Sequence, residues 1–293
     1  MAIISDISHH RGKISDITDR FAIKNFVLRD KALISPNQSL DESFIFNGFN
    51  FAVCLKGEST LQINYRDFPL KKGQILTYMP NQIFKVKDRS DDFLMENLFL
   101  SADYVLQLPL SKDFDLLKRI SIAPLQNISS EALHNMLEFH SLIAKHHRRE
   151  DNPYKEQQTK ALIFALLMEI SHIYSSAAIE ISPAVSRQEL LTDEFFKIML
   201  ENYKKERSVA YYADKLCLTP KYLSMTVKKV TGHPISDWIN EAVVVEAKRM
   251  LKTTDLTALQ ISEELNFPNP SFFGKFFKQY VGMTPLQYKG AKA

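Results

Sequence analysis

Cysteine is scarce in this 293-residue sequence, which contains only Cys54 and Cys217. Two distant thiols do not make a disulfide framework and suit a reducing compartment. We expect both to be small apolar fillers, one in a strand and one at a helix end. Long apolar runs are also lacking, because the longest, Ala161–Met168, is far below the ~20 residues that cross a bilayer. With a polar start and no apolar signal segment, the chain is expected to be cytoplasmic, with no membrane partner.

Histidine is missing between His10 and His134, so the strand-rich region described below has no imidazole for a metal. The sequence also lacks a Gly-rich phosphate loop, Cys/His metal spacing and a nucleophile elbow. The later histidines are expected to be packed or solvated helix residues, or structural in the Gly-His-Pro break at His233. We therefore predict no catalytic residue, no cofactor and no metal, and a protein that is not an enzyme.

The length predicts about two domains. From about Lys31 to Tyr104, short apolar runs alternate with Gly and Pro turns, and Leu61, Ile63 and Tyr65 show the period of a half-buried strand. Helical spacing follows at about 112–175, and residues 176–190 include a polar linker. We predict an α+β protein, with a β-barrel and appended helices in residues 1–180 and an all-α domain in residues 187–293.

The all-α part contains one pattern twice, about 50 residues apart. Ala213-x-x-Leu216-x-Leu218 precedes Tyr222-Leu223-Ser224 and Val227-Lys228, and Ser262-x-x-Leu265-x-Phe267 precedes Phe272-Phe273-Gly274 and Phe277-Lys278. Proline begins and glycine ends the second helix of each copy, as their backbone preferences favour. The predicted helices are Val209–Cys217 with Pro220–Thr231, and Leu259–Leu265 with Pro270–Val281. Two short helices joined by a tight turn are a helix-turn-helix unit.

The second helices of the two units lie in acid-free windows. Residues 215–236 hold four lysines and no acid, and so do residues 265–293. From Arg187 onward basic residues exceed acidic ones by four, whereas the preceding segment has one more acid than base. Lysines displace counterions from DNA, so these windows favour contact with phosphates over a merely solvated surface.

A helix between the units is predicted from Ser236-Asp237, as a cap, to about Leu251. Its length of about 22 Å suits a strut that holds two reading helices in successive major grooves. Trp238 is expected to pack at its start. In the last unit, Phe272, Phe276 and part of Phe273 and Phe277 follow the i, i+4 spacing of a core face, which we prefer to stacking on bases.

These motifs resemble the AraC/XylS family of bacterial transcriptional activators. The similarity covers about residues 190–290, and its most specific part runs from Phe272-Phe273-Gly274-Lys275-Phe276-Phe277-Lys278 to Gly282-Met283-Thr284-Pro285-x-x-Tyr288. The resemblance implies two helix-turn-helix units joined by a long helix. It also implies base-facing or phosphate-facing residues in each unit: Lys221, Ser224, Met225 and Lys228 in the first, and Pro270, Ser271, Gly274, Lys275 and Lys278 in the second.

Four departures from the family pattern bear on this site. Met225 stands where arginine is frequent, and Ala242-Val243 where an arginine is common in the linker helix. Asn266 replaces a usual glycine, but asparagine tolerates a left-handed backbone, so the turn should survive. Gly274 removes a side chain from the second reading helix, which shifts readout there toward backbone and shape.

The resemblance predicts a sequence-specific DNA-binding transcriptional regulator, of the activator type, modulated through its cupin-like N-terminal domain. Double-stranded promoter DNA and RNA polymerase are the expected partners, and a small-molecule effector and a homodimer are hypotheses that the sequence leaves open. One alternative is a small-molecule-binding module or degenerate cupin enzyme whose helical domain does not bind DNA specifically. Another is a non-specific architectural DNA binder, which predicts equal affinity for all sequences.

Overall fold

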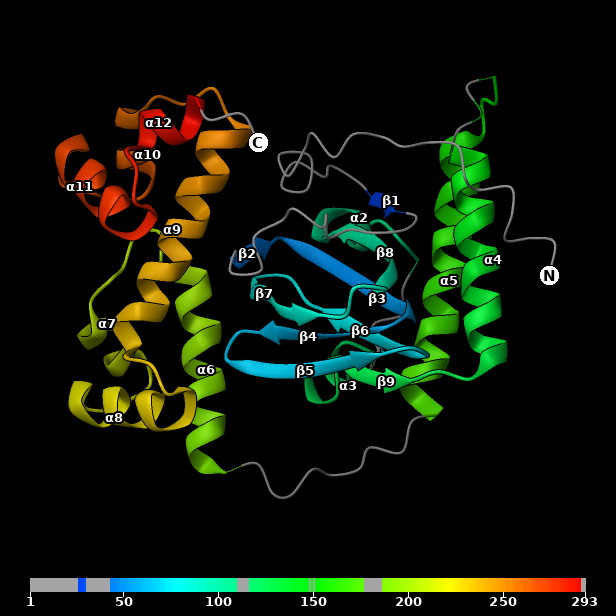
Figure 1. Ribbon diagram of the computed structural model, residues 1–293, viewed down its shortest axis with the longest axis horizontal. Coiled ribbons are helices and arrows are strands. Elements are labelled where there is room, and N and C mark those ends of the chain that lie inside the picture. The colour runs from blue at the N-terminus through cyan, green and yellow to red at the C-terminus, as the bar shows by residue number, and fades with distance from the viewer. Residues whose placement is uncertain are drawn as a thin grey trace.

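The computed structural model of this chain describes residues 26–29, 43–109, 116–147, 149, 151–176 and 186–290. Two antiparallel sheets lie at its centre, with helices on two sides (Figure 1). The α+β architecture predicted from the sequence is confirmed, with strands that form two facing sheets. The start of the predicted strand region and most of the predicted linker, residues 30–42 and 177–185, lie outside the described residues.

The larger sheet has five strands in the order β1-β8-β3-β6-β9. Their bounds are Phe26–Arg29 for β1, Leu94–Ser101 for β8, Gly48–Lys56 for β3, Gln74–Tyr78 for β6 and Leu125–Asn127 for β9. The smaller sheet, β2-β7-β4-β5, comprises Ser43–Phe46, Gln82–Arg89, Glu58–Ile63 and Arg66–Lys71. As the alternation predicted, Leu61 and Ile63 are buried with Cys54 between the sheets. Apolar side chains therefore fill the space between the two sheets. The alternation was wrong for Tyr65, which lies in the turn after β4 and packs against the C-terminal helices.

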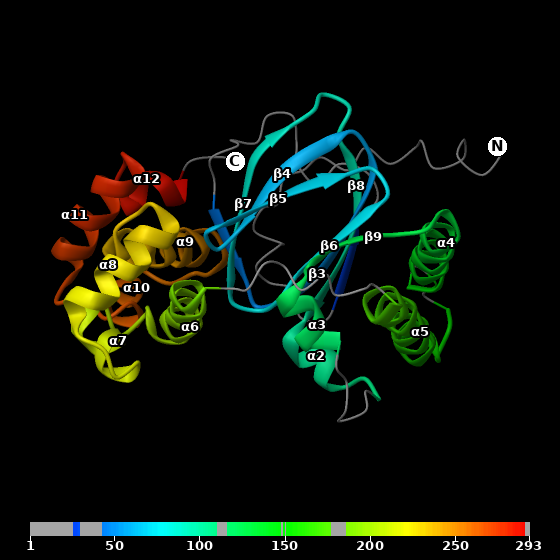
Figure 2. The same ribbon diagram turned by 90° about the horizontal axis from the view of Figure 1, so that it is seen from below.

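In the described part of the chain, α2 (Ala102–Leu106) and α3 (Leu116–Ile122) follow β8, and α4 (Ser130–His147) and α5 (Lys155–Ser176) follow β9. The long antiparallel pair α4 and α5 stands beside the larger sheet (Figures 1 and 2). Its apolar face, including Ile143, Ile163 and Ile170, is buried with Phe51 and Leu98 of the sheet. Buried His140 approaches Glu96 of β8, with 3.6 Å between Nδ1 and Oε2, so this histidine is packed as expected.

The remaining helices form the other side of the molecule: α6 (Arg187–Asn202), α7 (Val209–Lys215), α8 (Pro220–Thr231), α9 (Ile235–Thr253), α10 (Ala258–Glu264), α11 (Pro270–Val281) and α12 (Pro285–Gly290). They share one apolar cluster, to which Ile45 and Ile83 of the smaller sheet also belong. Helix α9 is the centre of this cluster. The sheets therefore lie between the α4–α5 pair and the C-terminal helices (Figure 2).

Candidate nucleic-acid interface

Helices α7 and α8 form the first helix-turn-helix unit. Leu216 caps α7, and Cys217 then adopts a left-handed backbone with φ 54°, which turns the chain. The side chain of Thr219 accepts a hydrogen bond from the backbone N–H of Tyr222 at 3.2 Å, and Pro220 occupies the first turn of α8. Gly232, at φ 80°, ends α8. The predicted bounds of α8 are confirmed, because its start and stop signals are local.

Helices α10 and α11 repeat this arrangement, and α11 also has its predicted bounds. Asn266 has φ 51°, so the prediction that asparagine would accept the left-handed turn is confirmed. Asn269 caps α11 by accepting from the N–H groups of Ser271 and Phe272, and Gly282 ends it at φ 82°. The first helix of each unit ends one or two residues earlier than predicted, because the left-handed turn residue and the residue before it lie outside the helix.

The two second helices bury equivalent positions. Leu223 and Val227 of α8 are fully buried, and so are Phe273 and Phe277 of α11. The prediction that the phenylalanines of α11 face the core is confirmed for Phe273 and Phe277 and wrong for Phe272. Phe272 is 59% exposed, and Phe276 is half-buried against Phe267. The i, i+4 spacing fits either pair of phenylalanines, and only the docking of α11 decides between them.

Cys217 is a second correction. It is exposed, not an apolar filler, because the left-handed turn directs its side chain outward. Cys54 is buried in β3 as predicted, and burial raises the pKa of its thiol to about 11. The predicted cap of the linker helix is also wrong, since α9 begins at Ile235 and Pro234 holds the N-cap position without a side-chain bond. Buried Ile235 and Trp238 anchor the start of α9.

The predicted contact residues of α8 lie on one stripe, because they are spaced i, i+3, i+4 and i+7. Lys221, Met225 and Lys228 are exposed and Ser224 is half-buried. In α11, Pro270, Ser271, Lys275 and Lys278 are exposed and Gly274 is half-buried. A Cβ on Gly274 would meet nothing within 4 Å, so the glycine leaves open surface there. Each unit thus presents a free, basic helix face.

Helices α8 and α11 lie at opposite ends of α9, on the side away from the sheets (Figure 1). Nineteen residues make α9 about 28 Å long. Its stripe Ile239, Val243, Ala247 and Leu251 is buried, and Ala242, Val244 and Val245 are buried as well. Contact on several faces explains why small apolar residues stand at 242–243. The strut predicted from the sequence holds α8 and α11 on one side of the molecule, each with an exposed face.

A buried carboxylate joins α9 to the end of α6. Glu246 is 4% exposed, and its oxygens accept from Arg249 Nε and Nη2, both at 2.8 Å, and from Lys204 Nζ at 2.6 Å. Burial alone would raise the pKa of Glu246, but the bonds from Arg249 and Lys204 outweigh it and lower that pKa. The carboxylate is therefore held charged inside the domain.

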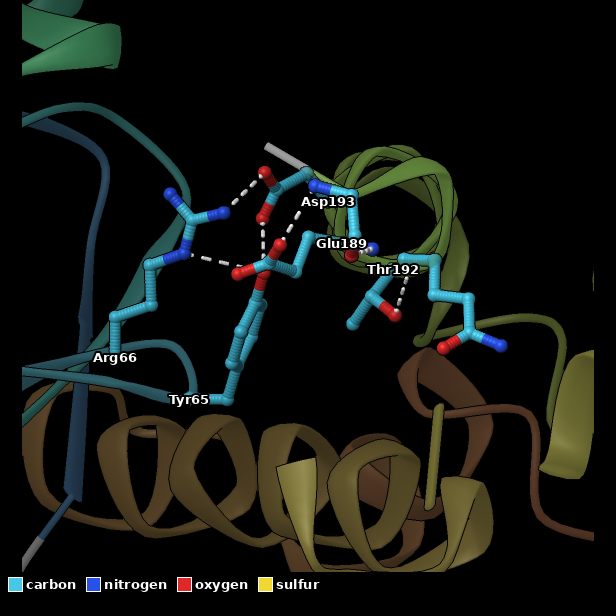
Figure 3. Close-up of polar contacts among 7 residues, drawn as sticks. Tyr65, Arg66, Glu189, Thr192 and Asp193 are labelled. Atoms are coloured by element: carbon cyan, nitrogen blue, oxygen red, sulfur yellow. Dashed lines mark hydrogen bonds and ion pairs between the residues drawn. The ribbon is translucent and has the colours of Figure 1, made fainter. Parts of the chain in front are cut away.

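The smaller sheet contacts the C-terminal helices through polar groups (Figure 3). Asp193 of α6 accepts from the Tyr65 hydroxyl at 2.6 Å and from Arg66 Nη2 at 2.8 Å. Burial and the bond to Asp193 raise the pKa of the Tyr65 hydroxyl. Ser43 of β2 donates to Glu241 of α9. These contacts link the strands to the helices that carry the first unit, and no sequence motif indicated them.

The sequence analysis did not identify two exposed aromatic residues on these helices. Tyr222 and Phe272, 43% and 59% exposed, hold equivalent positions beside the lysines of α8 and α11. Their 50-residue offset was visible, but an aromatic side chain at helical spacing favours the interpretation as a core residue.

Among the described residues, no three His, Cys, Asp or Glu side chains gather to hold a metal ion. None of the helices in the described ranges has the length and apolar character of a membrane span.

The comparison with protein families agrees with this geometry. A model described as a helix-turn-helix domain matches residues 212–291, which run from within α7 through α12. Residues 212–291 form an AraC-type helix-turn-helix domain. The C-terminal domain of the response regulator YesN from Fusobacterium nucleatum is 32% identical, and the match covers 33% of this chain and 95% of that domain, with a TM-score of 0.32.

Curated proteins that are similar to this part of the chain are described as transcriptional regulators. The HTH-type transcriptional regulator YisR of Bacillus subtilis is 28% identical over 104 residues, 36% of each chain. The HTH-type transcriptional activator RhaR of Escherichia coli is 23% identical over 146 residues, half of each chain. The match thus spans only a third to a half of these relatives. The family assignment accordingly describes the helix-turn-helix domain, and the activity of the whole protein is a separate question.

Proposed function

We propose that this protein is a sequence-specific DNA-binding regulator of transcription, of the activator type. The observation that carries the proposal is the repeated unit itself. Two helices of equal length, each with a capping side chain, a proline in the first turn and a terminal glycine, present exposed lysines on one side of a common strut. Two reading helices of this kind suit successive major grooves, which lie about 34 Å apart along one face of DNA.

Each contact residue has a proposed role. Lys221, Lys228, Lys275 and Lys278 supply phosphate contacts, which give affinity and salt dependence. Ser224, Met225, Pro270 and Ser271 lie where each helix meets base edges, and Met225 offers an apolar contact to a thymine methyl group. Gly274 leaves room for the backbone to approach the duplex, so readout by α11 relies more on DNA shape.

The strand-rich part is proposed to modulate DNA binding. The contacts from Tyr65, Arg66 and Ser43 to α6 and α9 support this role, because both helices pack against the first unit. We propose that residues 1–180 and 187–293 form two domains. An unidentified small-molecule effector, a homodimer and contact with RNA polymerase belong to the same proposal, and so does action in the cytoplasm.

Fluorescence anisotropy of the full chain on its own upstream DNA and on a scrambled duplex, at two salt concentrations, tests the function. Tighter binding to the upstream DNA supports it, and equal binding to both duplexes at every salt concentration contradicts specificity. Lys221→Ala should lower affinity and reduce the slope of log affinity against log salt by about one unit. Lys72→Ala is the matched control, because Lys72 is an exposed lysine in the turn between β5 and β6, outside the helix-turn-helix units. An equal loss in both variants would contradict the role of α8.

A further inference from the structure

The two helix-turn-helix units touch each other through a contact that does not involve α9. Arg207 lies in the loop that leads into α7, at the start of the first unit. Its Nη1 donates to the carbonyl oxygen of Asn266 at 3.0 Å, and its Nη2 donates to that of Leu265. Both carbonyls belong to the turn that ends α10 in the second unit. One guanidinium thus caps the C-terminal end of a helix that follows it by more than fifty residues.

A second bond runs in the opposite direction. The side-chain amide of Asn266 donates from Nδ2 to the carbonyl oxygen of Lys205 at 2.8 Å. Asn266 therefore accepts from the first unit through its backbone and donates to it through its side chain. The residue that provides the left-handed turn of the second unit also holds the first unit.

The surroundings of Arg207 strengthen the contact. Its guanidinium carbon lies 4.0 Å from the centre of the Phe267 ring, which is within cation–π range. The guanidinium of Arg207 is partly removed from water, and this burial lowers its pKa. A cation at the C-terminal end of a helix also interacts favourably with the helix dipole. The hydrogen bonds, the ring and the dipole all favour the same position for this side chain.

The chain path gives this contact a mechanical consequence. Helix α9 is the covalent connection from the first unit to the second, and both units pack against it through the shared apolar cluster. The bonds between 205–207 and 265–266 add a second connection at a different place. Two separate connections define a relative orientation that one helix does not.

We propose that Arg207 and Asn266 form an inter-unit clamp that locks α8 and α11 in one relative orientation, so that the protein reads half-sites at one spacing only. This inference rests on the proposed DNA-binding function. Each inserted base pair rotates a half-site by about 34° and moves it by about 3.4 Å along the duplex. A locked pair of reading helices cannot follow that change, whereas an unlocked pair can. Arg207 and Asn266 are thus positioning residues and do not themselves read DNA.

The first test measures the clamp without DNA. Spin labels at Lys229→Cys of α8 and Gln279→Cys of α11, both exposed, report the distance between the reading helices in the full chain. The background carries Cys217→Gly, which removes the exposed thiol and keeps the left-handed turn. With the clamp intact, double electron–electron resonance should give one narrow distance peak. Arg207→Met, Asn266→Gly and their combination should broaden or shift it.

The chain offers a matched control. Lys289 Nζ donates to the carbonyl oxygens of Thr254 and Leu256, which is also a cation on backbone carbonyls but joins the end of α9 to α12. Lys289→Met should therefore leave the peak unchanged. Asn266→Gly preserves the backbone conformation, so it separates loss of the clamp from loss of folding. If the distance peaks of Asn266→Gly and Arg207→Met have the same width and position as the peak of the control, the proposal of a clamp is wrong.

The second test measures half-site spacing. Wild-type protein first selects duplexes from a random pool, and the two half-sites are located by their protection in a footprinting assay. One to three base pairs are then inserted between these half-sites. A single insertion should weaken wild-type binding about tenfold, a penalty of about 1.4 kcal/mol, and weaken binding by the Arg207→Met/Asn266→Gly protein much less. Equal spacing preference in both proteins would overturn the inference. If no sequence is selected, the proposed function fails, while the distance measurement still decides whether the clamp exists.

Discussion

Replacing Glu246 with glutamine tests how the buried charge joins α6 to α9. Glu246→Gln keeps the shape of the side chain but removes the charge that faces Arg249 and Lys204. Hydrogen bonds to charged groups contribute about 1.5–3 kcal/mol. The side chains of Lys204 and Arg249 are 45% and 25% exposed, so both cations recover some hydration in the variant. We therefore expect a loss of about 2 kcal/mol in the free energy of unfolding, within the range above.

The loss should depend on pH in a defined direction. Because the folded-state pKa of Glu246 is lowered from its ordinary 4.5, its contribution to stability is complete above pH 4.5 and declines as the pH falls below that value. Urea titrations followed by circular dichroism at pH 7 and at lower pH measure the difference between wild type and variant. This difference should shrink as the solution becomes more acidic.

Glu194→Gln is the matched control for Glu246→Gln. Glu194 pairs with Lys197 at 3.7 Å on the surface of α6, and its side chain is 52% exposed. Exposed pairs of this kind contribute at most about 0.5 kcal/mol. If both variants lose the same free energy, or if the loss in Glu246→Gln grows as the pH falls, the account of a carboxylate held charged by its neighbours is wrong.

Four further substitutions test the packing of the C-terminal helices and their contact with the sheets. Phe273→Ala, which empties a fully buried site, should lower the free energy of unfolding by about 3–5 kcal/mol in urea titrations. Phe272→Ala should change it by less than about 0.5 kcal/mol, and equal losses in the two variants would contradict the observed register of α11. Gly282→Ala should lower the free energy of unfolding by about 1–2 kcal/mol through its positive φ alone, because a Cβ there meets nothing within 4 Å; an unchanged melting temperature would refute this. Asp193→Asn should change the free energy of unfolding by no more than about 1 kcal/mol, because the ion pair of Asp193 with Arg66 is partly exposed. The same variant should speed amide hydrogen exchange in α6, and unchanged exchange would show that the charge of Asp193 does not hold the sheet to this helix.

The local signals of the repeat were sufficient to predict α8 and α11 residue for residue. Proline in the first turn and glycine at the end act through the local backbone conformation, and the structure adds Thr219 and Asn269 as caps. The same locality explains why Asn266 could be predicted to adopt a left-handed turn. Alternation in β4 likewise predicted which residues lie between the sheets, because successive side chains of a strand point to opposite faces.

Only the tertiary structure decided the features that depend on contacts between distant segments. The sequence could not choose between Phe272 and Phe273 for the core, because both pairs of phenylalanines have the spacing of a helix face. It gave no sign that Arg207 reaches the turn at Asn266, or that Asp193 faces the turn at Arg66, because each contact joins residues more than fifty positions apart. Periodicity and caps report the local conformation of the chain, whereas the relative placement of helices and sheets follows from how their buried faces fit together.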